Sequence, residues 1–370
     1  MQQRVIISQD IEHDLAQAIA ETENDRVFVL TDDITQECCL PKVASLFAKH
    51  NATTITIRHD DTNKTLATLA DVWTALQRGG ATRHSLLVNL GGGMVTDLGG
   101  FAAATFKRGI NFINIPTTLL AMVDAAVGGK TGINFGGLKN EVGAFANARY
   151  VIVNTCFLDT LDTANLCSGY AEMLKHSLIS NAQMWAEHVN FDILQPDLAE
   201  LQRMVAASIT VKEHIVADDP HEHGIRKALN FGHTIGHALE EFSMQQPGGA
   251  VVSARLLPLA RARTAPKNTL LHGYAVAFGL IGELYISARK AGFPTARLHQ
   301  TARFIRENYG AVAFTCDDYP TLLNLMRHDK KNTSDTINFT LLHDIGDIRI
   351  NQTATDEEIR EALDFIREGY

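Results

Sequence analysis

Short apolar runs alternate with amphipathic stretches along the first part of the chain. Five runs rich in β-branched and other strand-forming residues have the length of strands, at residues 27–31, 53–58, 86–90, 112–115 and 150–154. Between them, apolar positions recur with helical spacing, as at 34–50 and 66–78. Because alternating strands and helices are typical of parallel sheets with crossover helices, the pattern predicts a Rossmann-like α/β domain over residues 1–165.

The pattern becomes helical after residue 165. Stretches such as 198–216, 274–291 and 357–368 repeat their apolar positions at about 3.6 residues, which predicts an all-helical domain over residues 166–370. Residues 339–342 and 348–351 have the alternation of a small late hairpin.

One stretch within the second part, residues 245–269, interrupts the helical pattern. It contains Pro247, Pro258 and Pro266, several basic residues and no acidic one, and its inner prolines exclude one continuous helix. We expect a surface loop insertion, because lengthening a loop costs little free energy. An element that contacts a partner or a second subunit is the alternative.

Composition narrows the class of protein. The 370 residues are 45% hydrophobic and 20% charged, which are values of globular proteins. A net charge of −9 argues against nucleic acid or an anionic membrane as a partner. Five cysteines form no CxxC pair and leave one over, which argues against a disulfide scaffold. No apolar stretch reaches the roughly 20 residues of a membrane span, and we expect a cytoplasmic protein.

A dense glycine cluster follows the apolar run at 86–90. Gly91, Gly92 and Gly93 lead into an Ala-rich helical stretch, and such a turn lets backbone N–H groups approach a pyrophosphate at a helix N-terminus. The third glycine of GxGxxG is missing from its usual place, so the ordinary dinucleotide fingerprint fails. The cluster favours a dinucleotide site, and tight packing of the turn is the alternative explanation.

A second group of glycines lies beside lysines. The sequence from 108 to 132 reads as a strand, a Pro-Thr-Thr turn and a helix, followed by a glycine-lysine loop that contains Lys130. Lys139 and Asn140 follow in another glycine-flanked segment, and both segments suit an anionic substrate. The sequence Gly-Gly-Lys-Thr at 128–131 lacks the first glycine of a P-loop and follows helix-like sequence, which excludes a nucleoside triphosphatase.

Three imidazoles and one carboxylate have the composition of a metal site. His233 and His237 stand four residues apart and share one helical face, and His272 opens the next helical stretch. Glu172 lies on a further helix, three residues before Lys175. A catalytic zinc takes three N or O ligands and keeps one open position, which Glu172, one of the paired histidines and His272 would supply. A helix surface or an N-terminal cap is the alternative for the histidine pair.

Six segments, in order, resemble the 3-dehydroquinate synthases of the sugar-phosphate cyclase superfamily. They are GGGMVTDLGGFAA, PTTLLAMVDAAVGGKTG, GLKNEVGAF, GYAEMLK, LNFGHTIGHALE and LHGYAVA, and the resemblance extends from about residue 25 to about residue 345. It implies a phosphate-eliminating carbon-oxygen lyase (EC 4.2.3.4) of the shikimate pathway. The implied substrate is 3-deoxy-arabino-heptulosonate 7-phosphate, which passes through transient NAD-dependent oxidation, phosphate elimination, re-reduction and intramolecular aldol closure. The implied active site lies in a cleft between the two domains.

The resemblance also implies roles for individual residues. The metal, Zn²⁺ or Co²⁺, would be bound by Glu172, His233 and His272. The implied catalytic residues are Asp124, Lys130, Lys175, Lys212 and His237. The implied substrate-binding residues are Arg108, Lys130, Asn140, Lys212, Arg226, Asn230 and Lys330, with Lys331 as the alternative to Lys330. The implied NAD⁺ contacts are Asp32, Asp61, Lys64, Gly92, Gly93, Met94, Asp97, Thr117, Thr118, Leu120, Asp124, Lys130, Lys139, Asn140, Phe157 and Thr160.

Two further features follow from the resemblance. Arg108 matches an arginine that reaches into the neighbouring subunit's site, which implies a homodimer. Ile34 and Asn165 stand where an asparagine and a glutamate are common, so one peripheral cofactor contact at each position is in doubt. Another sugar-phosphate cyclase, a metal-dependent polyol dehydrogenase and an inactive scaffold are the alternatives. The phosphate-directed lysines argue against the dehydrogenase, and the complete metal set argues against the scaffold.

Overall fold

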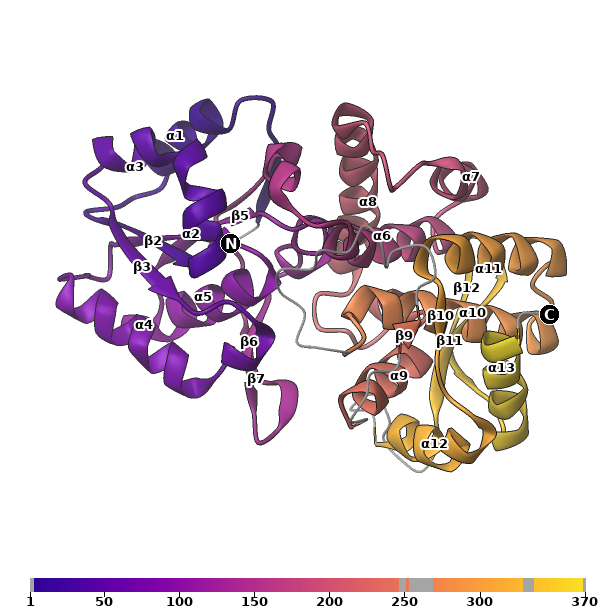
Figure 1. The fold of residues 1–370 in the computed structure, drawn as a ribbon. Coiled ribbons are helices and arrows are strands. Elements are labelled where there is room, and N and C mark those ends of the chain that lie inside the picture. The colour runs from indigo at the N-terminus through magenta and orange to yellow at the C-terminus, as the bar shows by residue number, and fades with distance from the viewer. Residues whose placement is uncertain (1–2, 246–250, 253–268, 329–335, 369–370) are drawn as a thin grey trace. The chain divides into compact units, whose positions relative to one another are not determined.

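The computed structural model describes residues 3–245, 251–252, 269–328 and 336–368. The chain forms two compact units (Figure 1). The first comprises Met1–Leu161 and Asp197–Ile209, and the second comprises Asp162–Pro196 and Thr210–Tyr370. The sequence pattern gave no sign that 197–209, the beginning of helix α8 (Leu198–Asp218), belongs with the first unit.

A six-stranded parallel sheet organises the first unit. Its spatial order is β1-β8-β5-β4-β2-β3. The strands are β1 (Arg4–Ile7), β2 (Val27–Asp32), β3 (Thr53–Ile57), β4 (Leu86–Gly91), β5 (Asn111–Pro116) and β8 (Tyr150–Val153). The five predicted strands are therefore confirmed to within about one residue, and β1 at the sheet edge was missed. The fold class predicted for this part of the chain is confirmed.

The order of the strands locates a crevice. From β2 the chain passes outward to β3, then returns to the other side of β2 for β4 and continues to β5 and β8. In open parallel sheets, ligands bind at the carboxyl ends of the strands at such a reversal. The carboxyl ends of β2 and β4 are therefore the expected ligand-binding edge.

Helices cover this sheet, and two segments differ from expectation. The helices are α1 (Ile11–Glu21), α2 (Asp33–Cys38), α3 (Ala44–Lys49), α4 (Leu66–Arg78) and α5 (Gly93–Thr105). The prediction of one helix over 34–50 is wrong, because Pro41 opens a short 3-10 turn, η1 (Leu40–Lys42), between α2 and α3. The predicted glycine-lysine loop is wrong as well, since its residues form the antiparallel hairpin of β6 (Lys130–Phe135) and β7 (Leu138–Phe145).

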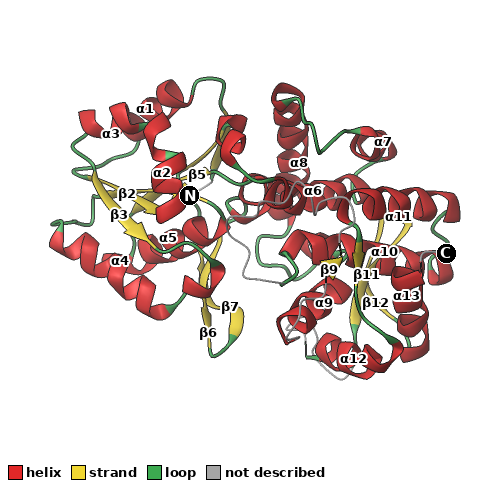
Figure 2. Ribbon diagram, in the orientation of Figure 1, coloured by secondary structure: helices red, strands yellow, loops and turns green. Residues whose placement is uncertain are grey.

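The second unit is mainly helical, as Figure 2 shows, and this part of the predicted fold is confirmed. Its helices are α6 (Thr163–Leu178), α7 (Ala182–Asn190), the end of α8, α9 (His233–Gln245), α10 (His272–Lys290), α11 (Thr295–Tyr309), α12 (Tyr319–Arg327) and α13 (Asp356–Glu368). The buried helix α10 packs against α6, α9, α11 and α13. The late hairpin is confirmed as β11 (Asn338–Asp344) and β12 (Asp347–Thr353).

The expected loop insertion lies mostly outside the described residues. Between its described end residues, Gln245 and Thr269, the described residues Val251–Val252 form the short strand β9, which pairs with β10 (Ala311–Val312). The two ends of the segment are close together, because the backbone N–H of Leu270 donates to Ser243 Oγ at 3.0 Å. Among the described residues, no helix is long and apolar enough to cross a membrane.

Candidate functional site

The residues predicted to contact a dinucleotide gather at the crevice edge of the first unit. Asp32 ends β2, and its Oδ1 accepts a hydrogen bond from the backbone N–H of Thr35 at 2.7 Å, which caps α2. Burial raises the pKa of Asp32 despite these hydrogen bonds from Thr35. On the neighbouring strand, Gly92 precedes α5 and offers no side chain to cap that helix.

Both explanations of the glycine cluster apply, each to a different residue. A Cβ on Gly91 would lie 2.6 Å from the Val95 side chain, so Gly91 is required for packing. Gly92 is the N-cap of α5 and Gly93 is its first residue, and the first backbone N–H groups of this helix have no side-chain cap. Such N–H groups suit an anionic group such as a pyrophosphate.

The end of β5 completes this edge. The backbone N–H of Thr117 donates to Gly91 O at 3.0 Å, which ties the β5 turn to the glycine turn. Thr117 is buried beside the Cys39 thiol, and its side chain lowers the pKa of that thiol against the larger effect of burial, which raises it. The predicted NAD⁺ site is physically consistent with the uncapped start of α5.

A polar network joins the β6–β7 hairpin to the turn after β3. Lys64 is 3% exposed, and its Nζ bonds to both Asp97 and Asn140 Oδ1. Burial raises the pKa of Asp97, and the Lys64 charge opposes that rise. Asp61 accepts from Asn134 Nδ2 through its backbone O at 2.9 Å and its Oδ2 at 3.2 Å. Five predicted positions are brought together here: Asp61, Lys64, Asp97, Lys139 and Asn140.

Sequence reasoning missed Asn134, which holds this network together. Besides its two bonds to Asp61, its Oδ1 accepts the backbone N–H of Asn140 at 2.9 Å. Asn140 has a positive φ of 50°, a conformation that asparagine adopts more readily than most residues. The sequence offered no signal for Asn134 beyond its place between two lysine-bearing segments.

The other candidates of the first unit occupy its turns. Asp124 lies in the short π-helical turn Ala121–Ala125, Lys130 is exposed at the start of β6, and Phe157 is buried in the turn Thr155–Thr160. Arg108 is exposed, and the consecutive residues Lys107 and Arg108 both have positive φ. The remaining candidates lie on α5 and in the turns after β5 and β8: Met94, Thr118, Leu120 and Thr160.

In the second unit, three side chains from three helices converge on one point. Glu172 comes from α6, and His233 and His272 are the first residues of α9 and α10. Glu172 Oε1 lies 3.4 Å from Nε2 of His233 and 3.4 Å from Nε2 of His272. Glu172 is fully buried, and its Oε1 has no hydrogen-bond partner within the described chain. These donors are the oxygen and nitrogen ligands that zinc prefers.

The second polar atom of each of these side chains is already engaged. Glu172 Oε2 accepts from Lys175 Nζ, which is also buried. His233 Nδ1 lies 3.1 Å from Phe231 O, and His272 Nδ1 lies 3.1 Å from Glu240 Oε2. Each of the three side chains therefore has one atom held by the protein and one atom directed to the shared point, an arrangement that is usual around a metal. Sequence reasoning did not select Glu240.

The charges around this point favour ionised Glu172. Burial alone would raise the pKa of Glu172, but the Lys175 ammonium and the two imidazoles outweigh burial and hold that pKa well below its ordinary range. Burial would lower the pKa of His272, but Glu240, together with Glu172, raises it to about 10. Binding of a metal ion at this point would require His272 Nε2 to be deprotonated. The residues present fit a divalent metal.

Glycines and a buried acid bring the three helices to this spacing. A Cβ on Gly273 would lie 1.8 Å from Ser168 O of α6, and a Cβ on Gly279 would lie 1.9 Å from Gly232 O. The buried Glu283 of α10 accepts the backbone N–H groups of Gly232 at 2.7 Å and Thr234 at 2.9 Å, which fixes the start of α9.

His237 lies one helical turn beyond His233. Its ring centroid is 5.3 Å from that of His233 and 5.9 Å from that of His272. His237 thus borders the convergence point.

The predicted substrate-binding residues of this unit are largely buried. Lys212 is 6% exposed and Arg226 is 2% exposed. Asp219 accepts the backbone N–H groups of Gly224 and Arg226, and Arg226 Nη1 donates to Pro220 O at 2.5 Å. These bonds fix the turn that presents Arg226. Asn230 Nδ2 donates to Glu222 Oε1 at 2.7 Å, whereas Lys330 and Lys331 lie outside the described residues.

Asn165 has a local role. Its backbone N–H and its Nδ2 each donate to the Asp162 carboxylate at 2.8 Å, which caps α6. Ile34 lies within α2.

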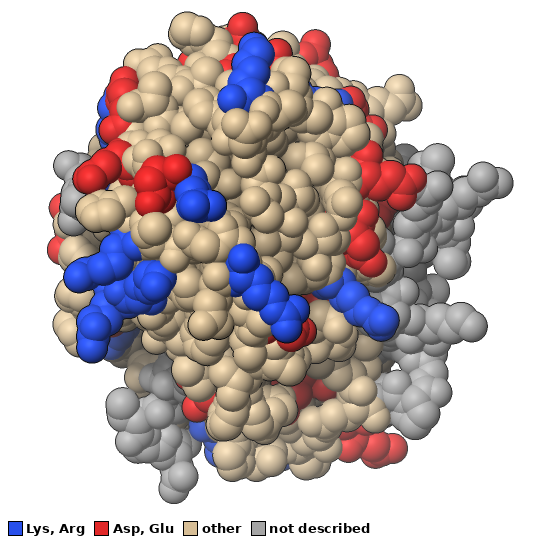
Figure 3. Space-filling model, turned by 90° about the vertical axis from the view of Figure 1, so that its left-hand side faces the viewer, with Lys and Arg blue, Asp and Glu red and all other residues tan. Residues whose placement is uncertain are grey.

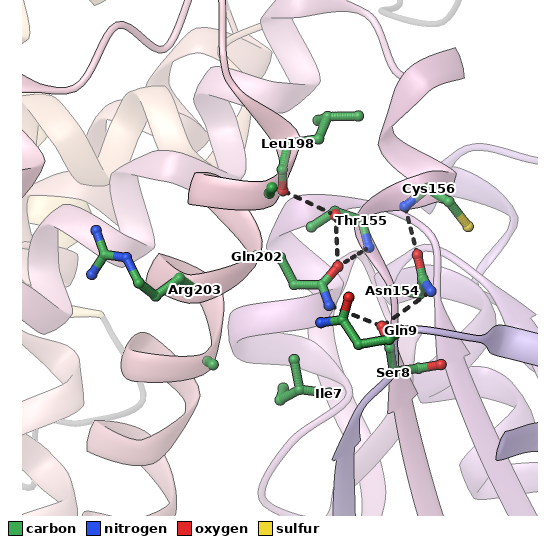
Figure 4. A pocket seen from close by; sticks show the side chains of 11 residues that line it. Ile7, Ser8, Gln9, Asn154, Thr155, Cys156, Leu198, Gln202 and Arg203 are labelled. Carbon is green, nitrogen blue, oxygen red and sulfur yellow. Dashed lines mark hydrogen bonds between the residues drawn. The ribbon is translucent and has the colours of Figure 1, made fainter.

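A surface pocket of about 430 Å³ in the first unit contains none of the candidates (Figure 4). It lies at the carboxyl ends of β1 and β8, where Gln202 Nε2 donates to Ser8 O at 2.9 Å and Thr155 Oγ1 donates to Gln202 Oε1 at 2.9 Å. These bonds fasten the beginning of α8 to the sheet edge. On the face drawn in Figure 3, acidic and basic side chains are both present and in places lie side by side, and uncharged residues cover most of the rest.

Known proteins match the whole chain. The model of the 3-dehydroquinate synthase N-terminal family matches residues 54–168, and that of the C-terminal family matches 169–257 and 260–332. A 3-dehydroquinate synthase of Parabacteroides distasonis is 50% identical over 369 residues, which cover 100% of this chain and 99% of that protein. The chain belongs to the 3-dehydroquinate synthase family. A member from Clostridium tetani is 32% identical over 343 residues, 92% of this chain and 86% of that protein.

Solved structures show the same fold at lower identity. A 2-epi-5-epi-valiolone synthase of Streptomyces hygroscopicus, with NAD⁺ and Zn²⁺ bound, has a TM-score of 0.81 at 23% identity, covering 100% of this chain and 98% of that one. A 2-deoxy-scyllo-inosose synthase with carbaglucose-6-phosphate, NAD⁺ and Co²⁺ also has a TM-score of 0.81, at 22% identity, covering 100% and 96%. The fold is that of the sugar-phosphate cyclases. A glycerol dehydrogenase of Schizosaccharomyces pombe is less similar, with a TM-score of 0.63 at 12% identity, covering 99% and 88%.

Proposed function

We propose that this chain converts 3-deoxy-arabino-heptulosonate 7-phosphate to 3-dehydroquinate and phosphate, as a 3-dehydroquinate synthase. The observation that carries the proposal is the convergence of Glu172 Oε1 and the two imidazole Nε2 atoms at 3.4 Å, in a chain 50% identical to a synthase over its full length. An inactive scaffold has no need of a buried carboxylate aimed at two imidazoles, because burying it costs free energy.

The proposed cofactors are NAD⁺ and Zn²⁺ or Co²⁺. When they are bound, the nicotinamide supplies a reversible hydride acceptor and the metal supplies a Lewis acid for a substrate hydroxyl. Asp32 and the uncapped start of α5 would bind the dinucleotide, with Lys64 and Asp97 beside them. Glu172, His233 and His272 would bind the metal.

The basic residues would bind and orient a phosphorylated, carboxylated substrate. Arg226 is held by the turn that Asp219 organises, and with Lys212 it suits a carboxylate, because a guanidinium and an ammonium provide a fork and a point charge. Lys130 and Asn140 suit the phosphate. Positioning of both ends of the substrate restricts it to one geometry for elimination and ring closure.

Lys175 and His237 would act next to the metal ligands. The ammonium of Lys175 bonds to the Glu172 carboxylate, which fixes the carboxylate and keeps it ionised. His237 and Asp124 are proposed to contact the reacting hydroxyls, where an imidazole or a carboxylate can hold a proton.

We also propose a homodimer and a cytoplasmic location. Two consecutive non-glycine residues with positive φ, Lys107 and Arg108, form a strained and exposed turn, and such strain often marks a functional contact. This supports the proposal that Arg108 serves the neighbouring subunit. Five free cysteines suit a reducing compartment.

The deciding experiment follows phosphate and NADH together after addition of the heptulosonate phosphate. We expect stoichiometric phosphate and 3-dehydroquinate, NAD⁺ required only in catalytic amounts, and no net NADH. Accumulation of NADH in step with turnover would instead establish a dehydrogenase. Absence of phosphate release from this substrate by the metal-loaded protein would favour another cyclase.

A further inference from the structure

Glu240 contacts one of the three proposed metal ligands without belonging to that set. It lies on α9, two turns after His233, and is 5% exposed. Its Oε2 is 3.1 Å from Nδ1 of His272, which is 32 residues further along the chain. The other imidazole nitrogen, Nε2, is the atom directed to Glu172.

We infer that Glu240 is a positioning residue: by accepting the Nδ1–H of His272 it fixes the tautomer and the orientation of that ring, so that Nε2 presents its lone pair to the metal. The inference rests on the proposed ligand set. An imidazole rotates about two side-chain bonds. A hydrogen bond from the ring nitrogen that does not face the metal removes that freedom and makes the other nitrogen a more basic ligand.

Neighbouring contacts show why this ring needs a fixed partner. His272 opens α10, and Leu271 before it makes no side-chain cap. The backbone there is held instead by two hydroxyls: Ser243 Oγ accepts from Leu270 N and Ser168 Oγ accepts from Gly273 N, both at 3.0 Å. These bonds fix the main chain on either side of His272 but leave the ring free to turn. Glu240 supplies the bond to the ring itself.

Each of the three proposed ligands is thus held in place by one other group of the protein. Lys175 holds the carboxylate of Glu172, the carbonyl of Phe231 holds the ring of His233, and Glu240 holds the ring of His272. Among these, the contact of Glu240 is the one in which a side chain holds an imidazole.

A second metal ion is the competing explanation. Donor atoms of His237, Glu240 and His272 also lie within 4.8 Å of one another. That site would share His272 with the first, so the ring would have to bind one ion through each nitrogen and lose both protons. A neutral imidazole has one free lone pair, so this arrangement is disfavoured at neutral pH. The orienting role requires no such loss.

The test compares Glu240→Gln and Glu240→Ala with Glu241→Gln, which makes the same chemical change at an exposed neighbour on α9. Each protein is loaded with one Zn²⁺, and transfer of the ion to a chromophoric chelator is followed. We expect about 10- to 100-fold weaker binding in both Glu240 variants, with the larger loss in the alanine variant, and no change in Glu241→Gln. The Co²⁺-loaded Glu240 variants should also show an altered visible absorption spectrum.

Two controls separate this inference from its neighbours. Metal-free Glu240→Gln should unfold at the same temperature as metal-free Glu241→Gln, so that weaker binding does not reflect a damaged fold. Unchanged Zn²⁺ retention and an unchanged Co²⁺ spectrum in both Glu240 variants would overturn the inference, as would two tightly bound Zn²⁺ per wild-type chain and one per Glu240 variant. Tight Zn²⁺ binding by His272→Ala would contradict the proposed ligand set instead.

Discussion

Replacement of Gly279 by alanine tests whether close helix packing sets the geometry of the metal site. Gly279 lies where α10 crosses the start of α9, and a Cβ there would be 1.9 Å from Gly232 O and 2.8 Å from Gly236 N. Both contacts are to backbone, which cannot rotate away. To reach ordinary van der Waals distance, α9 must retreat by about 1.5 Å, because packed interiors have no room for the methyl group.

The expected cost follows from two opposing effects. Overpacking a well-packed core destabilises by about 1–3 kcal/mol, and a 1.9 Å contact to backbone belongs at the upper end of that range. Alanine in place of glycine favours the helix by about 1 kcal/mol. The net destabilisation of the second unit is therefore about 2 kcal/mol, or about 4–8 °C in unfolding temperature. Retreat of α9 also moves His233 away from His272, so Zn²⁺ binding should weaken.

Gly282→Ala is the matched control, on the same helix and one turn away. A Cβ on Gly282 would meet the ends of two flexible side chains, Ile235 Cδ1 at 2.6 Å and Ile366 Cδ1 at 2.9 Å, which can adjust. We expect this variant to be as stable as the parent or slightly more stable.

The two tryptophans allow the second unit to be followed alone. Trp185 is buried in the second unit and Trp73 lies in the first, so in a Trp73→Phe background the fluorescence reports the second unit. Equal stability and equal Zn²⁺ affinity of the Gly279→Ala and Gly282→Ala proteins would refute the argument that backbone contact at this crossing sets the site.

Three further predictions concern the dimer, the polar network and the insertion. Mixing the inactive Arg108→Ala and His272→Ala proteins should restore about a quarter of the parent activity. After subunit exchange half of the dimers are mixed, and one of the two sites in each mixed dimer is intact. No recovery of activity would show that Arg108 serves the site of its own subunit. Asn134→Ala should raise the KM for NAD⁺ about tenfold and leave kcat within a few-fold of the parent value, because three hydrogen bonds that order the hairpin are lost. An unchanged KM would show that Asn134 does not contribute to the cofactor site. Deletion of residues 248–267 should leave Zn²⁺ binding and phosphate release within a few-fold of the parent. A hydrogen bond already joins the ends of the segment, and the free energy of loop closure changes by only ~0.6 kcal/mol per doubling of loop length. Loss of Zn²⁺ from a folded deletion variant would contradict this prediction.

The sequence predicts the features that depend on local pattern. The buried central strands β4 and β5 are mostly apolar, each with one inner asparagine, and α4 and α13 have clear apolar faces, so all four were predicted nearly to their ends. Strand β1 was missed because it is short and only partly buried at the sheet edge. The break between α2 and α3 lies at Pro41, because proline does not continue a helix.

Residues whose partners are distant in the chain could not be found in this way. Glu240 and Glu283 are acids on helices, and by local pattern they resemble any solvent-exposed glutamate. Their roles depend on contacts 32 residues ahead, to His272, and 51 residues back, to Gly232. Such contacts appear only when the crossing of α9 and α10 is known. The same holds for Gln202, which fastens α8 to Ser8 across 194 residues.

Glycines beside the candidate residues explain why the proposed metal-binding and cofactor-binding segments could be recognised from the sequence. In the second unit, Gly273 directly follows the proposed ligand His272, and its lack of a Cβ lets α10 touch α6, which carries Glu172. In the first unit, Gly91 is needed for packing, whereas Gly92 leaves the start of α5 uncapped. For the cluster Gly91–Gly93, packing and binding are therefore not alternatives, because each explains a different residue. Chemical side chains from separate elements meet only if their backbones approach closely, and close approach requires glycine beside the functional residue. Glycines next to histidines, acids and lysines therefore indicate where two elements approach each other closely, and the neighbouring side chains indicate the chemistry at that place.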